Sequence, residues 1–461
     1  MKIIGNKILL LIVCILSTGG MLAQTNFTLP EYTKTVLPNG LTVYLMEQHE
    51  VPMIQFSVVV ESGAVHDSKS GVAQSTAEGL LLGTKKFDKS TIEDKVDFIG
   101  ASLSSSAGLE RSYIWSSFMK KDQDVMLPVL QDVLLNPIFP EEEWTKLQSR
   151  KVAELTQSKE SPRAVISNYY NAFVYQNHVY GNAVDGDQES VAAITVSDLK
   201  QFYTNNYIPN NTAIAVVGDF STKEMSAKIS SLFKRWEKGE LNDIAITKKA
   251  EANKPRVLLV NKEDAGETTF LIGGKGVPRN NKDLVGINVI NTVLGGRFTS
   301  WLNDELRVNS GLTYGARSGF STYKHDGVFQ ISTFTANATT EETIDLALKT
   351  YQRLHTNYID EATLASAKNY TKGQFPPNFE TNSSLGSLLL DMHVYDFNES
   401  YINTFSQTVD ELTVDKVKVL VDSYFPKDNL QFVLVGKAEE LKKFASKYGE
   451  VTTKEITDTG Y

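Results

Sequence analysis

The chain repeats one local pattern twice, and this repeat limits the possible folds more than any other feature. In each copy a threonine opens a helical pattern, a tyrosine precedes a proline by two positions, and a glycine ends an apolar run. The matched residues are Thr195, Tyr207 and Gly218 in the first copy and Thr413, Tyr424 and Gly436 in the second. Their spacings are 218, 217 and 218 positions. Three matches at nearly one offset predict two homologous domains in tandem.

The two predicted domains cover residues 24–236 and 256–461, and residues 237–255 form the predicted linker. The linker is rich in Lys, Glu, Asn and Ala and lacks a large apolar face, as expected for a connecting segment. Each domain has about 210 residues, which is enough to bury a core of its own. Both domains begin with two strand patterns: Val43–Met46 and Gln55–Val60 in the first, Val257–Val260 and Thr268–Ile272 in the second.

Strand patterns within the first domain come in a group, and helical patterns come in a run. Asn39-Gly40 is typical of a turn between short strands, and Tyr113–Met119 has the composition of a strand. The expected helices are Thr91–Ile99, Val125–Leu134, Glu141–Ser158, Arg163–Tyr175, Thr222–Trp236 and, in the second domain, Glu439–Tyr448. Ser90 and Glu93 have the spacing of a capping box. Grouped strands and grouped helices indicate an α+β fold, in which each domain is an antiparallel sheet packed with helices.

The charge and the rare residues exclude several classes of function. The formal net charge is -9 and no block of Lys and Arg stands out, so nucleic acid is not an expected partner. The one cysteine, Cys14, excludes an intramolecular disulfide framework and a Cys-rich zinc module. No two of the six histidines lie three or four residues apart, so the chain has no helical histidine pair for a metal.

Residues 1–23 have the pattern of a secretory signal peptide. Lys2 and Lys7 precede the apolar run Ile8–Leu16, and small residues lead to Ala23 before Gln24. The run is shorter than the roughly 20 apolar residues that span a bilayer. We therefore expect a periplasmic or secreted protein without stable membrane insertion. A retained anchor is the alternative, because Met21 stands where a small residue is preferred.

The order of several short motifs resembles that of the pitrilysin, insulinase and mitochondrial-processing-peptidase family of zinc peptidases. In chain order the motifs are Leu37–Leu41, Ser62-Gly63, Gly71 to Thr84, Asn136-Pro137, Phe139-Pro140, Tyr180 to Gly186, Tyr207 to Gly218, Leu294–Gly296, Glu305–Arg307 and Gly311–Tyr314. The resemblance covers nearly the whole chain after the leader. It implies two similar α+β halves and a chemistry of peptide hydrolysis.

The first half departs from this family at its zinc motif. Active members carry His-x-x-Glu-His on the helix after the Ser-Gly strand, and in that register Gln74 and Glu78 take the histidine positions. Ala77 takes the position of the general base, and a methyl group cannot accept a proton from water. Glu154 falls near the family's third ligand, where a solvated or salt-bridged helix residue is the expected role. A Glu78–Glu154 pair that captures a hard cation is the alternative.

The second half contains an arginine and a tyrosine to which the resemblance assigns functional roles. In relatives a similarly spaced Arg and Tyr face the zinc, hold the substrate backbone and donate to the oxyanion; Arg307 and Tyr314 match them here. A guanidinium binds carbonyl oxygens and a phenol can donate to a tetrahedral intermediate, so the chemistry suits these roles. The alternative is structural: Arg307 in a surface ion pair and Tyr314 in the core.

One strand pattern bears on peptide binding. In 101–107 three serines alternate with small or apolar residues, which suits an exposed edge strand. In active relatives the corresponding edge accepts the substrate as an added strand. The simpler interpretation here is an edge of small residues without that role.

These observations predict a peptidase-like subunit that is inactive alone. The chain is expected to need no cofactor, while a homologous partner subunit supplies zinc, the histidines and the general base for a peptide substrate. The second hypothesis is a non-catalytic structural or peptide-binding protein with the same fold. An independent peptidase with another metal site is a third, disfavoured because the sequence contains no other ligand cluster.

The leader generates a first testable prediction. We expect the exported protein to begin near Gln24 and to remain in the soluble fraction, because the apolar run is too short to anchor it. N-terminal sequencing of the native protein checks this. An intact Met1 in a membrane fraction would contradict it.

Overall fold

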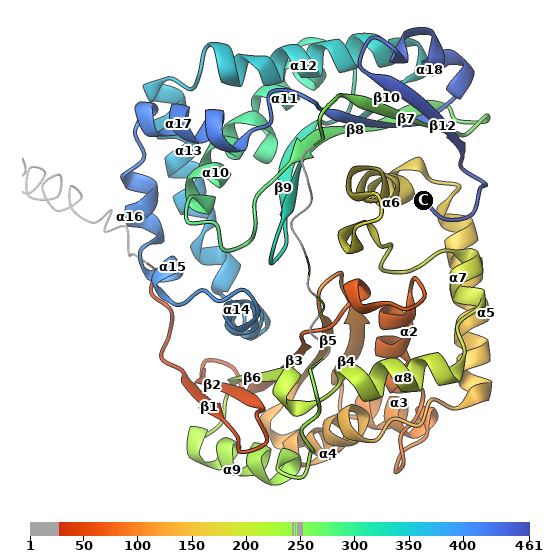
Figure 1. Cartoon of the computed structure of the whole chain (residues 1–461). Coiled ribbons are helices and arrows are strands. Elements are labelled where there is room, and N and C mark those ends of the chain that lie inside the picture. The colour runs from red at the N-terminus through yellow and green to blue at the C-terminus, as the bar shows by residue number, and fades with distance from the viewer. Residues whose placement is uncertain (1–26, 242–243, 245, 247–251) are drawn as a thin grey trace, which may run out of the picture.

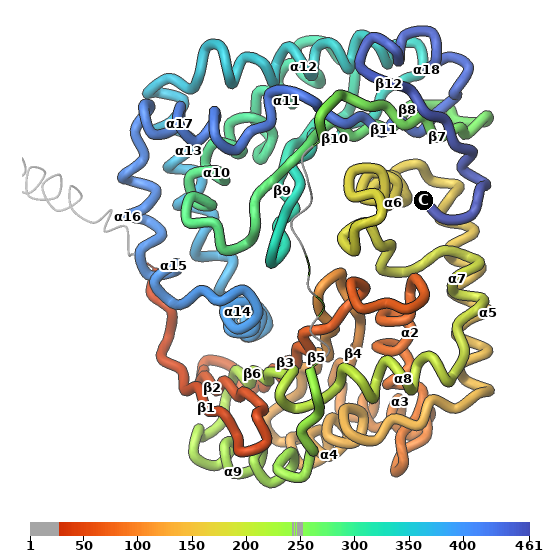
Figure 2. Tube along the Cα trace, in the orientation of Figure 1, coloured from red at the N-terminus to blue at the C-terminus, as the bar shows by residue number. Residues whose placement is uncertain are grey.

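A computed structural model describes residues 27–241, 244, 246 and 252–461; Figures 1 and 2 show its ribbon and its Cα trace. The predicted leader, residues 1–23, lies outside the described residues, as does part of the predicted linker. The rest forms two halves, each built around a six-stranded sheet. In Figure 1 the first half lies below the second.

The first sheet has the strand order β1-β2-β6-β3-β5-β4. Its strands are β1 Thr33–Val36, β2 Thr42–Glu47, β3 Met53–Val60, β4 Ser102–Ala107, β5 Ser112–Met119 and β6 Thr212–Gly218. Neighbouring strands are antiparallel except β2 and β6, which are parallel. Every residue of β6 is buried, which explains its uninterrupted run of small and β-branched side chains.

The second sheet repeats this order from its second strand onward, as β12-β7-β11-β8-β10-β9. Its strands are β7 Arg256–Asn261, β8 Glu267–Lys275, β9 Arg317–Thr322, β10 Gly327–Ala336, β11 Gln431–Gly436 and β12 Glu450–Glu455. The halves differ at the outer strand: β1 pairs antiparallel with β2, whereas β12 pairs parallel with β7. Both β4 and β9 are edge strands, so the expected edge at 101–107 is present.

In each half, helices lie between the strands in sequence and after them. The first half contains α2 Val72–Gly79, α3 Lys89–Phe98, α4 Gln123–Leu135, α5 Glu141–Ser158, α6 Pro162–Tyr175, α7 Gln188–Ala192, α8 Val196–Asn206 and α9 Thr222–Phe233. The second contains α10 Leu284–Asn291, α11 Trp301–Asn303, α12 Thr340–Thr356, α13 Glu361–Gln374, α14 Asn382–Val394, α15 Ser400–Asn403, α16 Phe405–Asp410, α17 Val414–Tyr424 and α18 Ala438–Ala445. The repeated threonines, Thr195 and Thr413, are N-caps: each accepts a hydrogen bond from a backbone N–H of the first turn.

One helix of each half packs against the sheet of the other half. Helix α6 of the first half packs on β8 and β11, and α14 of the second half packs on β3 and β6. Both helices lie between the two sheets in Figure 1. The Tyr170 hydroxyl of α6 donates to the Phe329 carbonyl at 3.1 Å, across the boundary. On α14, Gly386 allows close approach, since a Cβ there would lie 3.3 Å from the Ser57 hydroxyl.

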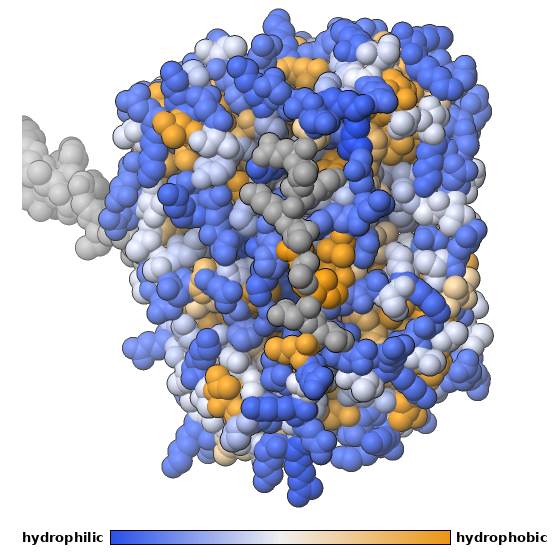
Figure 3. Space-filling model, in the orientation of Figure 1, coloured by the Kyte–Doolittle hydropathy of each residue, from blue (hydrophilic) through white to orange (hydrophobic). Residues whose placement is uncertain are grey.

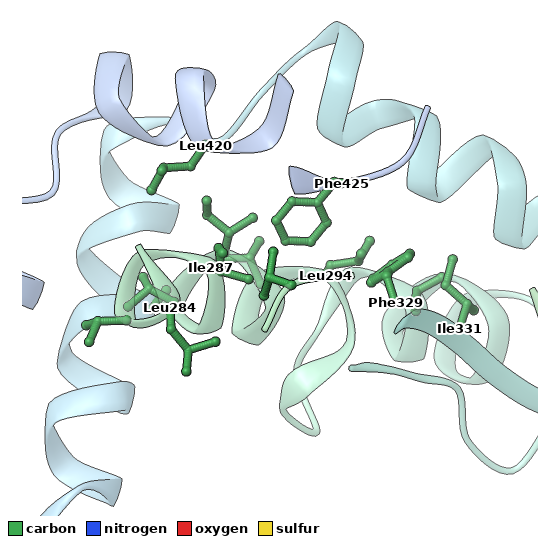
Figure 4. Packing of buried hydrophobic residues seen from close by; sticks show 14 of the residues in the cluster. Leu284, Ile287, Leu294, Phe329, Ile331, Leu420 and Phe425 are labelled. Atoms are coloured by element: carbon green, nitrogen blue, oxygen red, sulfur yellow. The ribbon is translucent and has the colours of Figure 1, made fainter. Parts of the chain in front are cut away.

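The buried apolar residues show the same exchange. One cluster joins strands of the first sheet, such as Met46 and Val217, with residues of α14 and the second half, such as Leu389. Figure 4 shows the part of this cluster beneath α17. A second cluster belongs to the first half alone, and a third places α6 against the second sheet. Figure 3 shows a mostly hydrophilic face with small separate hydrophobic groups.

Charged side chains reinforce the boundary between the halves. Glu61 follows β3 and contacts Lys324 at 3.2 Å and His393 of α14 at 3.3 Å. Burial opposes ionisation of Glu61, but the two partners outweigh it, so the pKa of this carboxyl is lowered. Arg111 and Asp391 form a second cross-boundary pair at 2.6 Å.

The α+β architecture with two homologous domains is confirmed, and the sheets are mixed rather than wholly antiparallel. One local prediction is wrong: Ser90 and Glu93 do not cap the third helix. Asp88 is the N-cap, because its carboxylate accepts the Thr91 N–H at 2.8 Å, and the helix begins at Lys89. Among the described residues, no helix is long and apolar enough to cross a membrane.

The exchanged helices predict that the halves unfold together. Leu389 of α14 is fully buried in the shared cluster, so Leu389→Ala should lower the free energy of unfolding by about 2–5 kcal/mol. Denaturant titration followed by circular dichroism should show one transition for both proteins. Val419→Ala, at a position 63% exposed on α17, is the control and should change stability by less than about 0.5 kcal/mol. Two separate transitions in the wild-type chain would refute the shared core.

Candidate functional site: a closed helix pair and an exposed Arg–Tyr loop

Helix α2 is held at a defined position by its first turn. Gly71, its N-cap, has a φ of 91°, and a Cβ there would lie 2.9 Å from the Asp185 carbonyl oxygen. The Asp67 carboxylate accepts the N–H groups of Gly71 at 2.8 Å and Ala73 at 2.7 Å. Burial raises the pKa of Asp67 to about 7, although these backbone donors oppose the rise.

Gln74 and Glu78 lie on one face of α2 and contact each other directly. The Gln74 amide donates to a Glu78 carboxylate oxygen at 2.6 Å. Lys151 of α5 donates its ammonium to both oxygens of the same carboxylate, each at 2.9 Å. The Gln74 carbonyl oxygen accepts the N–H of Ala107, the last residue of β4, at 2.6 Å. We call Gln74, Glu78, Lys151 and Ala107 the closed site.

The closed site does not suit the zinc ion that the family resemblance implies. Both Glu78 oxygens already accept from an ammonium, and the remaining side chain on this face is an amide, a weak ligand beside imidazole. Ala77 is fully buried and has no group that could move a proton. Within the described part of the chain, no group of three His, Cys, Asp or Glu residues is arranged to hold a metal.

Glu154 is not part of this site. Its side chain is 65% exposed and lies 3.7 Å from Arg150 on the same helix, as expected for a solvated helix residue. The sequence interpretation missed Lys151, which faces Glu78 instead. A signal was present: Lys151 follows Trp144 and Leu147 on one helical stripe, and all three are buried. A lysine on an apolar stripe indicates a charge with a buried partner.

Arg307 and Tyr314 lie in residues 304–314 of the second half, which we call the Arg–Tyr loop. Arg307 belongs to a π-helical turn, η7 Asp304–Asn309, which Leu306 anchors with a fully buried side chain. The Arg307 guanidinium lies 4.8 Å from the ring centre of Phe298, within the range of a cation–π contact. Tyr314 is 84% exposed, so the structural alternative that places it in a core does not describe this residue.

The closed site and the Arg–Tyr loop lie in different halves. Helix α2 packs with α8 and β4, whereas η7 packs with α11 and α12. Large apolar side chains are exposed nearby: Val308 of η7 is 63% exposed, and Phe298, which precedes α11, is 66% exposed. Lone exposed apolar residues are ordinary, but several close together in the chain are typical of a contact surface.

Two models of one peptidase family match the chain in succession. The model described as insulinase, peptidase family M16, matches residues 42–188, and the model described as peptidase M16 inactive domain matches residues 193–371. A Rickettsia felis protein named an uncharacterized zinc protease is 25% identical over 72% of this chain and 80% of its own length. A Helicobacter pylori protein named a non-peptidase homolog is 22% identical over 86% of this chain and 92% of its own.

A solved structure has the same fold. The crystal structure titled peptidase M16 inactive domain from Pseudomonas fluorescens superposes with a TM-score of 0.83 at 25% identity. The match covers 88% of this chain and 98% of that one. The two-sheet architecture described above is therefore one that solved proteins of this kind share.

The closed site generates a prediction about metal and activity. We expect the purified chain to hold no stoichiometric zinc and to cleave no peptide, because an ammonium, an amide and a methyl group stand where two ligands and a base are needed. Metal analysis after dialysis and a quenched-fluorescence peptide assay measure both. One equivalent of tightly bound zinc that is lost in Gln74→Ala or Glu78→Ala would contradict the prediction.

Proposed function

This chain belongs to the M16 peptidase family, and we propose that it is the subunit without zinc in a two-subunit peptidase. In this proposal a homologous subunit supplies zinc, histidines and general base, and hydrolyses a peptide. The present chain supplies Arg307 and Tyr314, together with half of the chamber that encloses the substrate. Its own zinc-motif residues take no part in the reaction.

The exposure of Tyr314 carries the proposal. A phenol ring that is 84% exposed gains almost no packing energy from its own chain. Its hydroxyl is free to donate to a group outside the chain, and Arg307, seven residues earlier, lies beside the ring of Phe298. A side chain kept only for stability is expected to bury its ring, as Tyr169 and Tyr170 do.

The chemistry of the pair suits the step that a zinc-bearing partner needs. As hydroxide attacks the scissile carbonyl, negative charge develops on its oxygen. A phenol placed about 3 Å from that oxygen stabilises the charge, and a guanidinium fork holds neighbouring carbonyl groups of the peptide. Neither role requires a proton acceptor or a metal ligand in this chain.

The proposal also includes export of this protein from the cytoplasm. The charged start, short apolar run and small-residue exit in residues 1–23 support cleavage near Ala23 and action in the periplasm or outside the cell. The peptide substrate would then be met in that compartment, where the zinc-bearing subunit must also reside.

A second function is favoured by the closed site. A chain that satisfies its former ligand positions internally could have kept the fold as a structural or peptide-binding protein. This alternative agrees with the name of the Helicobacter pylori relative, a non-peptidase homolog. The two functions differ in whether Arg307 and Tyr314 affect the turnover of a partner.

Mutation of the loop distinguishes them. In the native complex, isolated through a tag on this chain, Tyr314→Phe removes one hydroxyl and should lower kcat by about 10²–10³. Arg307→Lys keeps the charge but loses the fork, so it should also lower kcat. Assembly and thermal stability should stay unchanged, because Tyr314 is exposed and Arg307 is only partly buried, outside the core.

Tyr358→Phe is the matched control, since this tyrosine faces Asp422 rather than the Arg–Tyr loop. Its kcat should equal that of the wild type. Unchanged kcat for both loop variants in an assembled, active complex would exclude the complementing role and favour the structural alternative.

A further inference from the structure

We infer that Lys151 replaces the metal ion of the family's zinc site as the cation that joins α2 to α5. The chain has not simply lost its zinc site; it has closed the site with an ammonium of its own. This inference concerns the chain alone and does not rest on the proposed function.

The contacts of Lys151 are those of a bound cation. Its ammonium lies 2.9 Å from each Glu78 oxygen, and the residue is only 6% exposed. A buried ammonium is costly unless it is paired and hydrogen-bonded. Glu78, whose side chain is 26% exposed, provides that pairing with a charge of opposite sign, so the buried ammonium depends on it.

The position of Lys151 gives the pair a structural task. The family resemblance places two zinc ligands on the helix now seen as α2 and the third on the helix now seen as α5. A zinc ion would therefore tie α2 to α5. Lys151 and Glu78 make the same link in this chain, one from each helix. From Glu78 the link continues through Gln74 to the Ala107 N–H at the end of edge strand β4.

The second half shows which part of this network the fold itself requires. Asn291, the last residue of α10, also holds an edge strand with its amide. It donates to the Ser318 carbonyl of β9 at 3.0 Å and accepts from the Ser318 hydroxyl at 2.7 Å. An amide that clasps the edge strand is thus common to both halves.

The cation, in contrast, is needed only in the first half. The two contacts between Asn291 and Ser318 join neutral groups. In the first half, by contrast, the amide that holds β4 also donates to the Glu78 carboxylate. The carboxylate requires a cation there, and Lys151 is that cation.

A charge-coupling experiment tests the inference on the mature chain without any partner. Lys151→Met keeps the length of the side chain and removes the charge, so the thermal midpoint should fall by several degrees. Glu78→Gln in the same chain removes the stranded carboxylate, so the double variant should regain at least half of that loss. Lys146→Met is the control: Lys146 is an exposed lysine of α5 in surface ion pairs, and its loss should leave the midpoint unchanged.

If Lys151→Met does not fold, the comparison starts from the Glu78→Gln variant instead. Glu78→Gln alone should be destabilised, because it leaves the Lys151 ammonium without its counter-charge, and adding Lys151→Met should restore stability. Strictly additive midpoints in either direction would overturn the inference, because they would mean that the two charges do not stabilise each other.

A second arm tests the competition with metal. The triple variant Gln74→His, Ala77→Glu, Glu78→His restores the family's motif, and its zinc affinity is measured by competition with a colorimetric chelator. Adding Lys151→Met should raise that affinity at least tenfold, whereas adding Lys146→Met should not. Equal zinc affinity with and without Lys151 would also overturn the inference.

Discussion

Each sheet in this protein depends on a helix from the other half. A six-stranded sheet has two faces, and the helices that follow it in sequence cover only one of them. The other face of the first sheet is covered by α14, and that of the second sheet by α6. The apolar cluster that includes Met46 and Leu389 therefore belongs to both halves at once. Although the repeat predicts two similar domains, the exchange gives them a shared core, which is why we expect them to unfold together.

This shared core explains how chemistry could be lost without loss of fold. The ligand positions of α2 are on the surface of that helix that meets α5 and β4, away from the exchanged helices. There the Gln74 amide and the Lys151 ammonium both donate to the Glu78 carboxylate. Gln74 holds β4 much as Asn291 holds β9, so the clasp on the edge strand survives in both halves. The cation beside Glu78 in this chain is the buried Lys151 ammonium.

The two candidate sites have opposite physical character. In the closed site, each polar group named here meets another group of the same chain, so the site has little left to offer a ligand. The Arg–Tyr loop and the nearby Phe298 present a guanidinium, a phenol and two apolar side chains to solvent. Buried polar groups that satisfy one another stabilise a fold, whereas exposed aromatic residues beside an arginine are typical of contact surfaces. This asymmetry is why the proposed function assigns the contact with a partner to the second half.

The sequence alone determined the tandem repeat, the α+β class, most strand and helix positions, the degenerate zinc motif and the Arg307–Tyr314 pair. These depend on periodicity, on spacing and on local caps, which act over a few residues. Only the tertiary structure decided that α6 and α14 exchange, that β12 rather than a hairpin strand closes the second sheet, and that Lys151 rather than Glu154 faces Glu78. Residues 73 or more positions apart make these contacts, and which of them meet is set by how whole apolar faces pack. A local pattern can show that Lys151 lies on a buried stripe, but only packing brings the carboxylate that neutralises it.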